Sequence, residues 1–169
     1  MSLTEECPKP ERGGYKVFEW SDKFLQGSAF DSSQPKQQSQ RKQTLAVISV
    51  CNDKQFNPAY IASSLANKQA FCDKWGAACI LSKSQDVWEK FHQISHALGT
   101  TDADWIMWLD CDAAFTNLDI DWHEHLRGYL DSSKVLLAST YKNSTDLGVM
   151  FVPNNKLAGQ FMDELYETR

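Results

Sequence analysis

The sequence lacks long apolar runs and basic clusters. No run approaches the roughly 20 apolar residues that cross a bilayer, and the N-terminus has no apolar core of a secretory signal, so the chain as given is expected to be soluble. The net charge is −5 over 169 residues, which argues against nucleic acid as a partner. These absences leave a folded domain that acts on small molecules or other non-nucleic partners.

Glycine-rich phosphate-binding motifs are absent as well. Neither Gly-x-Gly-x-x-Gly after the first predicted strand nor a Walker lysine motif occurs in the chain. A helix N-terminus is therefore not the expected cradle for phosphates. If this chain binds a nucleotide, a metal ion must hold the phosphates.

Cysteine patterns typical of zinc sites are also missing. The five cysteines have no ligand spacing and are odd in number: Cys7, Cys51, Cys72, Cys79 and Cys111. Three of them lie in or beside predicted strands, where cysteine usually serves as a small buried apolar residue. One disulfide is compatible with the count, but nothing in the sequence favours a particular pair.

What is present indicates one folded domain behind a polar tail. Hydrophobic residues make up 42% of the chain, which includes six tryptophans. Residues 1–43 are rich in polar residues and read as an N-terminal tail with a short aromatic element at 15–25. Residues 44–169 are expected to form the domain, because a chain of this length usually has a single core.

Apolar runs and helical periodicities alternate after residue 44. The two predicted helices in this region have end signals: Pro58 in the first turn and Gly76 as the C-cap of the first helix, and Gly99 as the end of the second. This alternation predicts an α/β fold with a mostly parallel central sheet. The predicted strands are 45–50, 77–81, 105–109, 135–139 and 148–152, and the predicted helices are 58–75, 87–99, 119–130 and 157–166.

The most apolar strand ends in two aspartates. Trp105–Leu109 reads as a buried strand, and Asp110, Cys111 and Asp112 follow it. Residues i and i+2 of an extended segment point to the same side, so both carboxylates can face one site. Their mutual repulsion is relieved by a hard divalent cation such as Mg²⁺. A bare Asp-x-Asp is more often a solvated turn, and its place after this strand is what favours a metal site.

Three stretches together resemble a known family. Ala103–Asp112 looks like the core of the nucleotide-diphosphosugar glycosyltransferases, and Asn67–Gly76 and Asp146–Asn155 agree with it in order. The resemblance is greatest to the family that holds fungal α-galactosyl- and α-mannosyltransferases and plant xyloglucan xylosyltransferases. It covers residues 44–168 and implies a Rossmann-like GT-A fold, a UDP- or GDP-sugar donor and a glycan acceptor.

The resemblance also implies roles for individual residues. Asp110 and Asp112 would hold Mn²⁺ or Mg²⁺, and Lys90 would lie toward the diphosphate or the sugar. Asp146 stands at the asparagine of the family's Asn-x-Gly and is the candidate catalytic residue beside the sugar. The nucleotide would lie at the C-terminal edge of the first strand, against Val50, Cys51, Asn52 and Asp53. Cys111, between the two aspartates, is included in the same site.

Several of these residues have ordinary alternatives. Lys90 on an amphipathic helix is also compatible with a solvated side chain, and Asn52 and Asp53 with a turn after the strand. Asp146 is equally compatible with a turn role beside Gly148. His123 and His125 follow the strand Trp105–Leu109 and its two aspartates closely enough to reach an ion, although surface histidines are common on helices.

The chain departs from the family at Trp75, where a histidine is usual, and at Pro153, where an arginine is usual. It also ends at Arg169, before the family's Asp-Asp-Gln segment and metal-binding histidine.

The expected function is that of a glycosyltransferase or its donor-binding half, with a catalytically incomplete binding module as the alternative. A haloacid-dehalogenase-type phosphohydrolase fits less well, because Ala113 and Ala114 stand where that motif has a Gly-Thr-like pair. The expected compartment is the Golgi lumen for a piece of a eukaryotic protein and the cytoplasm for a bacterial or viral one.

Overall fold

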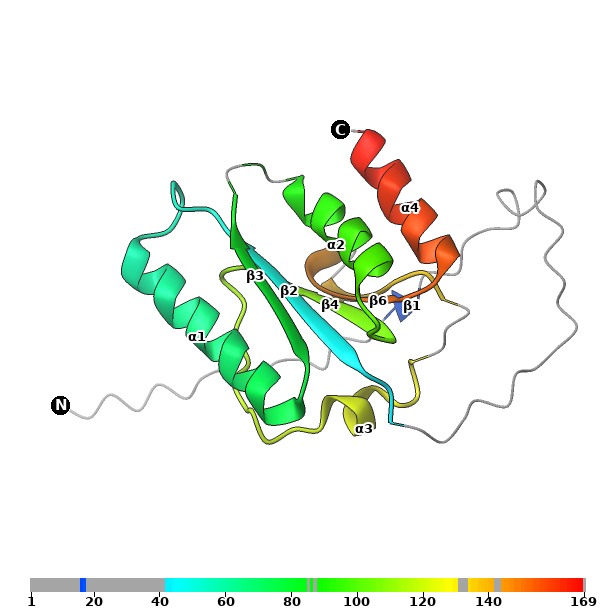
Figure 1. Ribbon diagram of the computed structural model, residues 1–169, viewed down its shortest axis with the longest axis horizontal. Coiled ribbons are helices and arrows are strands. Elements are labelled where there is room, and N and C mark those ends of the chain that lie inside the picture. Colours follow the sequence, from blue (N-terminus) through cyan, green and yellow to red (C-terminus); the bar gives the residue numbers. More distant parts are fainter. Residues whose placement is uncertain are drawn as a thin grey trace, which may run out of the picture.

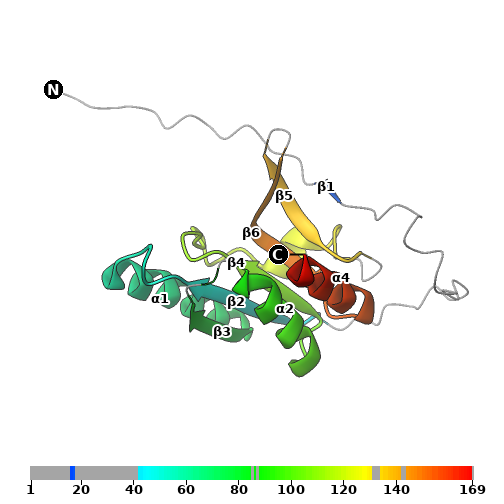
Figure 2. The same cartoon turned by 90° about the horizontal axis from the view of Figure 1, so that it is seen from above.

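A computed structural model describes residues 16–17, 42–84, 86, 88–130, 134–141 and 144–168. The rest of the predicted tail, residues 1–15 and 18–41, lies outside this part of the chain. A six-stranded sheet forms the middle layer, with helices on both of its faces (Figures 1 and 2). Among the described residues, no helix is both long and apolar enough to cross a membrane.

The strand order of the sheet is β1-β5-β6-β4-β2-β3. Strands β3, β2 and β4 run parallel, as the alternation of strands and helices predicts, whereas β6, β5 and β1 add antiparallel pairs. The strands are β1 Lys16–Val17, β2 Leu45–Cys51, β3 Ala78–Lys83, β4 Trp105–Leu109, β5 Leu137–Tyr141 and β6 Ser144–Pro153. The helices are α1 Pro58–Trp75, α2 Glu89–Thr100, α3 Trp122–Leu126 and α4 Lys156–Glu167.

Helix α1 begins and ends at the residues that the sequence predicts. The side chain of Asn57 accepts a hydrogen bond from the Tyr60 amide, and Pro58 follows in the first turn, where its missing N–H is not needed. Gly76 ends the helix with φ 65°, a conformation that glycine adopts without a steric penalty. Local signals are strong here because both ends of the helix carry their own capping residue.

Two helix predictions are wrong in their bounds. Gly99 does not end α2, which continues to Thr100, where the Thr101 amide bonds back to Ala97. The predicted helix at 119–130 is reduced to α3, which Asp121 caps and which spans only Trp122–Leu126. A single glycine lowers helix stability by about 1 kcal/mol, which packing against the sheet readily offsets.

Strand β4 is the centre of the core because both of its faces are buried. Trp105, Met107 and Leu109 pack toward α1 and α3, while Ile106 and Trp108 pack toward α2 and α4. The two tryptophans are 1% and 3% exposed. The prediction of a fully buried strand is therefore confirmed. Helices α2 and α4 lie side by side on one face of the sheet and together cover Ile106 and Trp108 (Figures 1 and 2).

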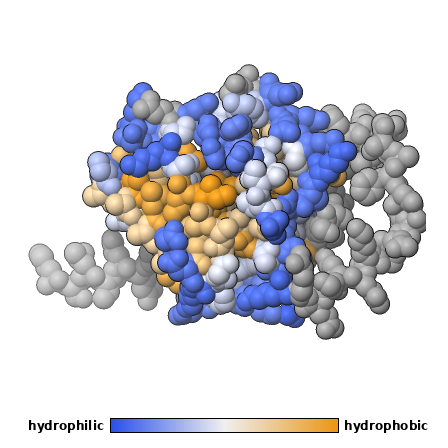
Figure 3. Space-filling model, in the orientation of Figure 1, coloured by the Kyte–Doolittle hydropathy of each residue, from blue (hydrophilic) through white to orange (hydrophobic). Residues whose placement is uncertain are grey.

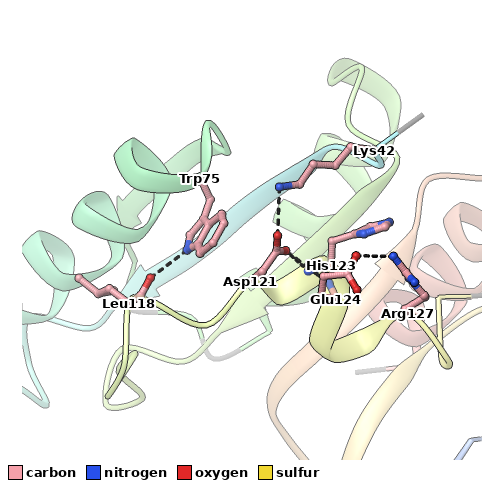
Figure 4. Close-up of polar contacts among 7 residues, drawn as sticks. All are labelled: Lys42, Trp75, Leu118, Asp121, His123, Glu124 and Arg127. Carbon is pink, nitrogen blue, oxygen red and sulfur yellow. Dashed lines mark hydrogen bonds and ion pairs between the residues drawn. The ribbon is translucent and has the colours of Figure 1, made fainter. Parts of the chain in front are cut away.

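The segment between β4 and α3 is tied to the end of α1 (Figure 4). The indole nitrogen of Trp75 donates to the carbonyl of Leu118 at 3.1 Å. Asp121 accepts from the ammonium of Lys42 at 3.3 Å and caps α3 through the amide of His123. Trp75, one of the departures from the family, thus has a structural contact in this chain.

The edge strand β3 is only partly covered. Its residues Ile80 and Leu81 are half-buried, and the face seen in Figure 3 has apolar surface gathered over β3 and the adjoining part of α1. Because β3 is the last strand of the sheet, this surface marks the side of the fold that lies away from β6.

Candidate functional site

Strand direction brings three distant segments to one edge of the sheet. Strands β2 and β4 are parallel neighbours, with Ile48 opposite Trp108, so their carboxyl ends lie together. Strand β6 is antiparallel to β4, with Val149 opposite Leu109, so its N-terminal half reaches the same edge. This is the edge at which open α/β sheets bind ligands.

A polar cavity of about 230 Å³ opens at this edge. Most of the residues predicted for the nucleotide and the metal line it, and they come from β2, α2 and the turn after β4. The lining residues are Val50, Asn52, Gln55, Phe56, Ser84, Asp86, Lys90, Trp108, Asp110, Cys111 and Asp112. Gln55, Phe56, Ser84, Asp86 and Trp108 were not predicted from the sequence, and no pattern in it marks them.

The remaining predicted residues lie beside the cavity. Cys51 is fully buried behind it, and Asp53 is exposed in the turn that follows β2. In that turn the side chain of Asn52 accepts a hydrogen bond from the amide of Lys54 at 2.9 Å. The side-chain oxygen of Asn52 therefore has the turn role that the sequence allowed, while the residue still lines the cavity.

The first aspartate of the turn is held in place by its neighbours. The indole nitrogen of Trp108 donates to Asp110 Oδ1 at 2.6 Å, and the Asp110 amide donates to the carbonyl of Gly148 at 2.8 Å. Trp108 is buried, so it cannot easily follow the carboxylate elsewhere. These two bonds direct the other carboxylate oxygen, Oδ2, toward Gly148.

Gly148 lies where two carboxylates converge. A Cβ atom on this residue would be 3.0 Å from Asp146 Oδ1 and 3.2 Å from Asp110 Oδ2. Asp146 Oδ1 also accepts the Gly148 amide at 2.8 Å, and the pairing of β5 with β6 shifts register between Ala138 and Ser139. The structure thus places Asp146 close to the aspartate turn, which we define as residues 110–113, and on an exposed part of β6.

A disulfide joins the turn to the neighbouring strand. Cys51 at the end of β2 is bonded to Cys111, the middle residue of Asp-x-Asp, with 4.9 Å between their Cα atoms. A second disulfide links Cys72 of α1 to Cys79 of β3. The prediction that Cys51 and Cys111 are buried is confirmed, but they are buried as a covalent pair that attaches the turn to β2.

The chemistry of this edge fits a hard divalent cation. Among the described residues, no group of three or more His, Cys, Asp or Glu side chains converges, so the protein would offer the two carboxylates of the turn. Mg²⁺ usually takes one or two carboxylates together with substrate phosphates and water, which matches this set.

The histidines considered as metal ligands lie elsewhere. His123 belongs to α3, next to the contacts of Asp121 shown in Figure 4, and His125 lines a separate cavity. That second cavity, about 280 Å³, has an apolar wall that includes Phe71, Met107 and Phe151. It contains neither lysine nor carboxylate, so it is unsuited to a diphosphate, and the polar cavity is the candidate site.

The sequence matches the model of one protein family. The model of the galactosyl transferase GMA12/MNN10 family matches residues 40–132, which include β2, α1, β3, α2, β4 and the aspartate turn. No curated protein matches the chain.

Solved structures also match the chain, among them two glycosyltransferases. One is a glycosyltransferase involved in the glycosylation of the major capsid of PBCV-1, with a TM-score of 0.61 and 15% identity over 75% of this chain and 66% of that one. The other is the glycosyltransferase GlyE of Streptococcus pneumoniae TIGR4, with a TM-score of 0.48 and 15% identity over 75% of this chain and 38% of that one. The chain thus spans less than two thirds of either structure.

Proposed function

Since the chain belongs to the galactosyl transferase GMA12/MNN10 family, we propose that it is the donor-binding part of a metal-dependent glycosyltransferase. The donor would be a UDP- or GDP-sugar, and the group transferred a hexose or pentose, with a glycan as acceptor. The observation that carries this proposal is the polar cavity, where Asp110, Asp112, Lys90 and Asn52 line one space at the carboxyl ends of β2 and β4.

The residues of the cavity divide into three groups by their chemistry. The carboxylates of Asp110 and Asp112 would hold Mn²⁺ or Mg²⁺, which neutralises the charge of a departing nucleoside diphosphate when bound. Lys90 is half-buried on α2 at the wall of the cavity, where its ammonium suits a phosphate oxygen. Val50, Asn52 and the adjoining turn would contact the base and ribose.

Asp146 is proposed to orient the donor sugar. Its carboxylate lies against Gly148 and therefore beside Asp110, at the side of the aspartate turn that faces β6. An exposed carboxylate there can accept hydrogen bonds from sugar hydroxyl groups. Asp146→Asn, which restores the residue usual in the family, should keep nucleotide binding and change the rate at which the donor is consumed.

Two alternative functions differ from this one in what the cavity does to its ligand. A binding module without catalysis would use the same cavity, so it differs only in turnover. A haloacid-dehalogenase-type hydrolase would use the first aspartate as a nucleophile, but Asp110 accepts the buried indole of Trp108 and its second oxygen faces Gly148. Those contacts suit a fixed metal ligand better than a nucleophile that must approach a phosphorus atom.

The disulfides favour an oxidising compartment for the protein. Disulfides persist in secretory and extracellular compartments and are rare in the cytosol. Cys51–Cys111 and Cys72–Cys79 would both form there. Of the two expected compartments, we therefore propose the secretory lumen, and mass spectrometry of the chain from its source, alkylated before reduction, would detect both bridges if this is right.

The function is tested with radiolabelled UDP- and GDP-sugars, with and without mono- and oligosaccharide acceptors. Consumption of one donor class is expected to require Mn²⁺ or Mg²⁺ and to be lost in Asp112→Asn. The matched control is Asp119→Asn, which changes an exposed aspartate that pairs with Lys74 at the end of α1 and does not line the polar cavity. Metal-dependent binding without any turnover would favour the binding module, and turnover of a generic phosphate ester would favour the hydrolase.

A further inference from the structure

Lys68 is a charged residue in an unusual place. It lies on α1 and is 0% exposed, which makes it the only fully buried charged side chain in the part of the chain whose side chains are described. Burying an ammonium is costly unless its protons are all bound, so such a group must be matched by its surroundings.

The partners of Lys68 belong almost entirely to the aspartate turn. Its ammonium donates to the carbonyl of Ala113 at 2.8 Å and to the carbonyl of Cys111 at 3.4 Å. The third bond, at 2.7 Å, goes to the hydroxyl of Ser64 one helical turn away, and that hydroxyl also donates to the Cys111 carbonyl. Lys68 therefore binds the carbonyl groups on both sides of Asp112.

These contacts fix the backbone around Asp112 from the side of α1. Asp112 itself is exposed at the cavity, while the carbonyls of the residues before and after it point to the interior. The disulfide at Cys111 secures the turn to β2, and Lys68 secures it to α1. The two attachments come from different layers of the fold and together leave the turn little freedom to rotate.

The electrostatic environment agrees with this geometry. Burial lowers the pKa of Lys68 from 10.5 to about 8, and the carboxylates of Asp112 and Asp110 act in the opposite direction by favouring the ammonium. The ammonium is thus close enough to interact with both proposed metal ligands, although it contacts neither.

We propose that Lys68 is a positioning residue of the donor site, which holds the peptide groups around Asp112 so that the two carboxylates of the turn present themselves to the cation together. This inference rests on the proposed function, because it assumes that Asp110 and Asp112 bind a metal with the donor. It adds a residue that touches neither metal nor donor, and it assigns a purpose to a buried charge on α1.

The test compares Lys68→Met with the wild-type chain. Methionine keeps an unbranched stem of similar length and removes the charge and all three donors. Mn²⁺ binding is measured by electron paramagnetic resonance in the presence of UDP and, separately, GDP. Loss of the residue that orients a metal ligand typically weakens metal affinity by roughly 10- to 100-fold, and that is the expected change.

Simple electrostatics predicts the opposite sign. Removing a positive charge near a cation site should by itself tighten cation binding. Weaker Mn²⁺ binding in Lys68→Met would therefore identify positioning as the dominant effect, and unchanged or tighter binding would overturn the inference.

Two further variants separate positioning from stability. Ser64→Ala keeps the charge of Lys68 but removes the hydroxyl that links it to Cys111, so it should weaken Mn²⁺ binding by a smaller factor in the same direction. Ile94→Ala truncates the core on α2, on the opposite face of the sheet, and should leave Mn²⁺ affinity unchanged. If Ile94→Ala weakened it as much as Lys68→Met, the effect would be general destabilisation and the inference would fail.

A readout without metal completes the experiment. The amide of Ala113 donates to the carbonyl of Asp110 within the turn, and the amide of Asp110 donates to the carbonyl of Gly148 on β6. Their hydrogen exchange should accelerate in Lys68→Met while amides of β2 stay protected. If the wild-type chain bound no Mn²⁺ with either nucleotide, the proposed function would fail and this inference with it; if only the variant were indistinguishable from wild type, the inference alone would fail.

Discussion

The disulfide between Cys51 and Cys111 should contribute more to stability than the one between Cys72 and Cys79. The perturbation is a pair of double variants, Cys51→Ala/Cys111→Ala and Cys72→Ala/Cys79→Ala, each compared with the oxidised parent. Both are made with Cys7→Ser, so that no unpaired thiol can exchange with the bridges. The chemistry removed is then the same in both variants, and the principal difference is the length of chain that each bridge closes.

The magnitude follows from the loop that each bridge closes. The sequence separations are 60 residues for Cys51–Cys111 and 7 residues for Cys72–Cys79. The chain-entropy relation converts these to stabilisations of about 4 and about 2 kcal/mol at 25 °C. The longer loop contains α1, β3, α2 and β4, so the bridge restricts most of the parallel half of the sheet in the unfolded chain.

The assay is equilibrium urea denaturation, followed by tryptophan fluorescence. Both variants should unfold at lower urea than the parent, and the Cys51–Cys111 variant should lose about 2 kcal/mol more than the other. The slope m should rise in both, because an unfolded chain without the bridge exposes more surface. Equal losses, or a larger loss for Cys72–Cys79, would refute the reasoning from loop length.

Three further predictions concern residues beside the aspartate turn. Trp108→Phe keeps the ring in the core but removes the donor to Asp110, so Mn²⁺-dependent nucleotide binding should weaken by roughly tenfold in calorimetry, since a hydrogen bond to a charged group contributes about 1.5–3 kcal/mol; an unchanged affinity would contradict it. Gly148→Ala would place a methyl group against Asp146 and Asp110 and should cost about 1–3 kcal/mol in denaturation, which a neutral result would disprove. The lowered pKa of Lys68 means that the unfolded chain binds more protons between pH 8 and 10.5, so stability should rise by about 3 kcal/mol across that window, and Lys68→Met should remove that rise in pH-dependent denaturation.

The parts of the fold that the sequence predicted well carry their own local signals. Pro58 and Gly76 mark the ends of α1, and the apolar run Trp105–Leu109 marks a strand buried on both faces. The aspartates after that strand could be assigned to a ligand edge because parallel strands end there together. The family resemblance rested on Asn67–Gly76, Ala103–Asp112 and Asp146–Asn155, and the family model matches the first two of these stretches, within residues 40–132.

The parts that were missed depend on contacts between distant residues. The pairing of Cys51 with Cys111 requires knowing that the ends of β2 and β4 are adjacent, and the cysteine count alone permits many pairings. The resemblance alone placed Asp146 in the site, because its approach to Asp110 depends on the antiparallel register of β6 and on the register shift between Ala138 and Ser139. No periodicity in the sequence encodes either relation.

Lys68 shows the same limit at the level of one side chain. It lies on the buried face of α1, between Ser64 and Phe71, where a lysine would ordinarily extend its charge to solvent. Burial is explained only by the three acceptors that the aspartate turn and Ser64 present. The role of this buried lysine can therefore be inferred only from the folded structure, which shows where its acceptors lie.

The central claim is that Asp110 and Asp112 bind a divalent cation together with a nucleoside diphosphate. Calorimetry of UDP and GDP in Mn²⁺, with Asp110→Asn, Asp112→Asn and the exposed control Asp119→Asn, tests it directly. Mn²⁺ should bind weakly alone and more tightly with one of the nucleotides, because the diphosphate supplies further oxygen ligands. Both turn variants should lose this metal-dependent binding while Asp119→Asn retains it; binding that is unchanged in both turn variants would contradict the assignment of Asp110 and Asp112 as metal ligands.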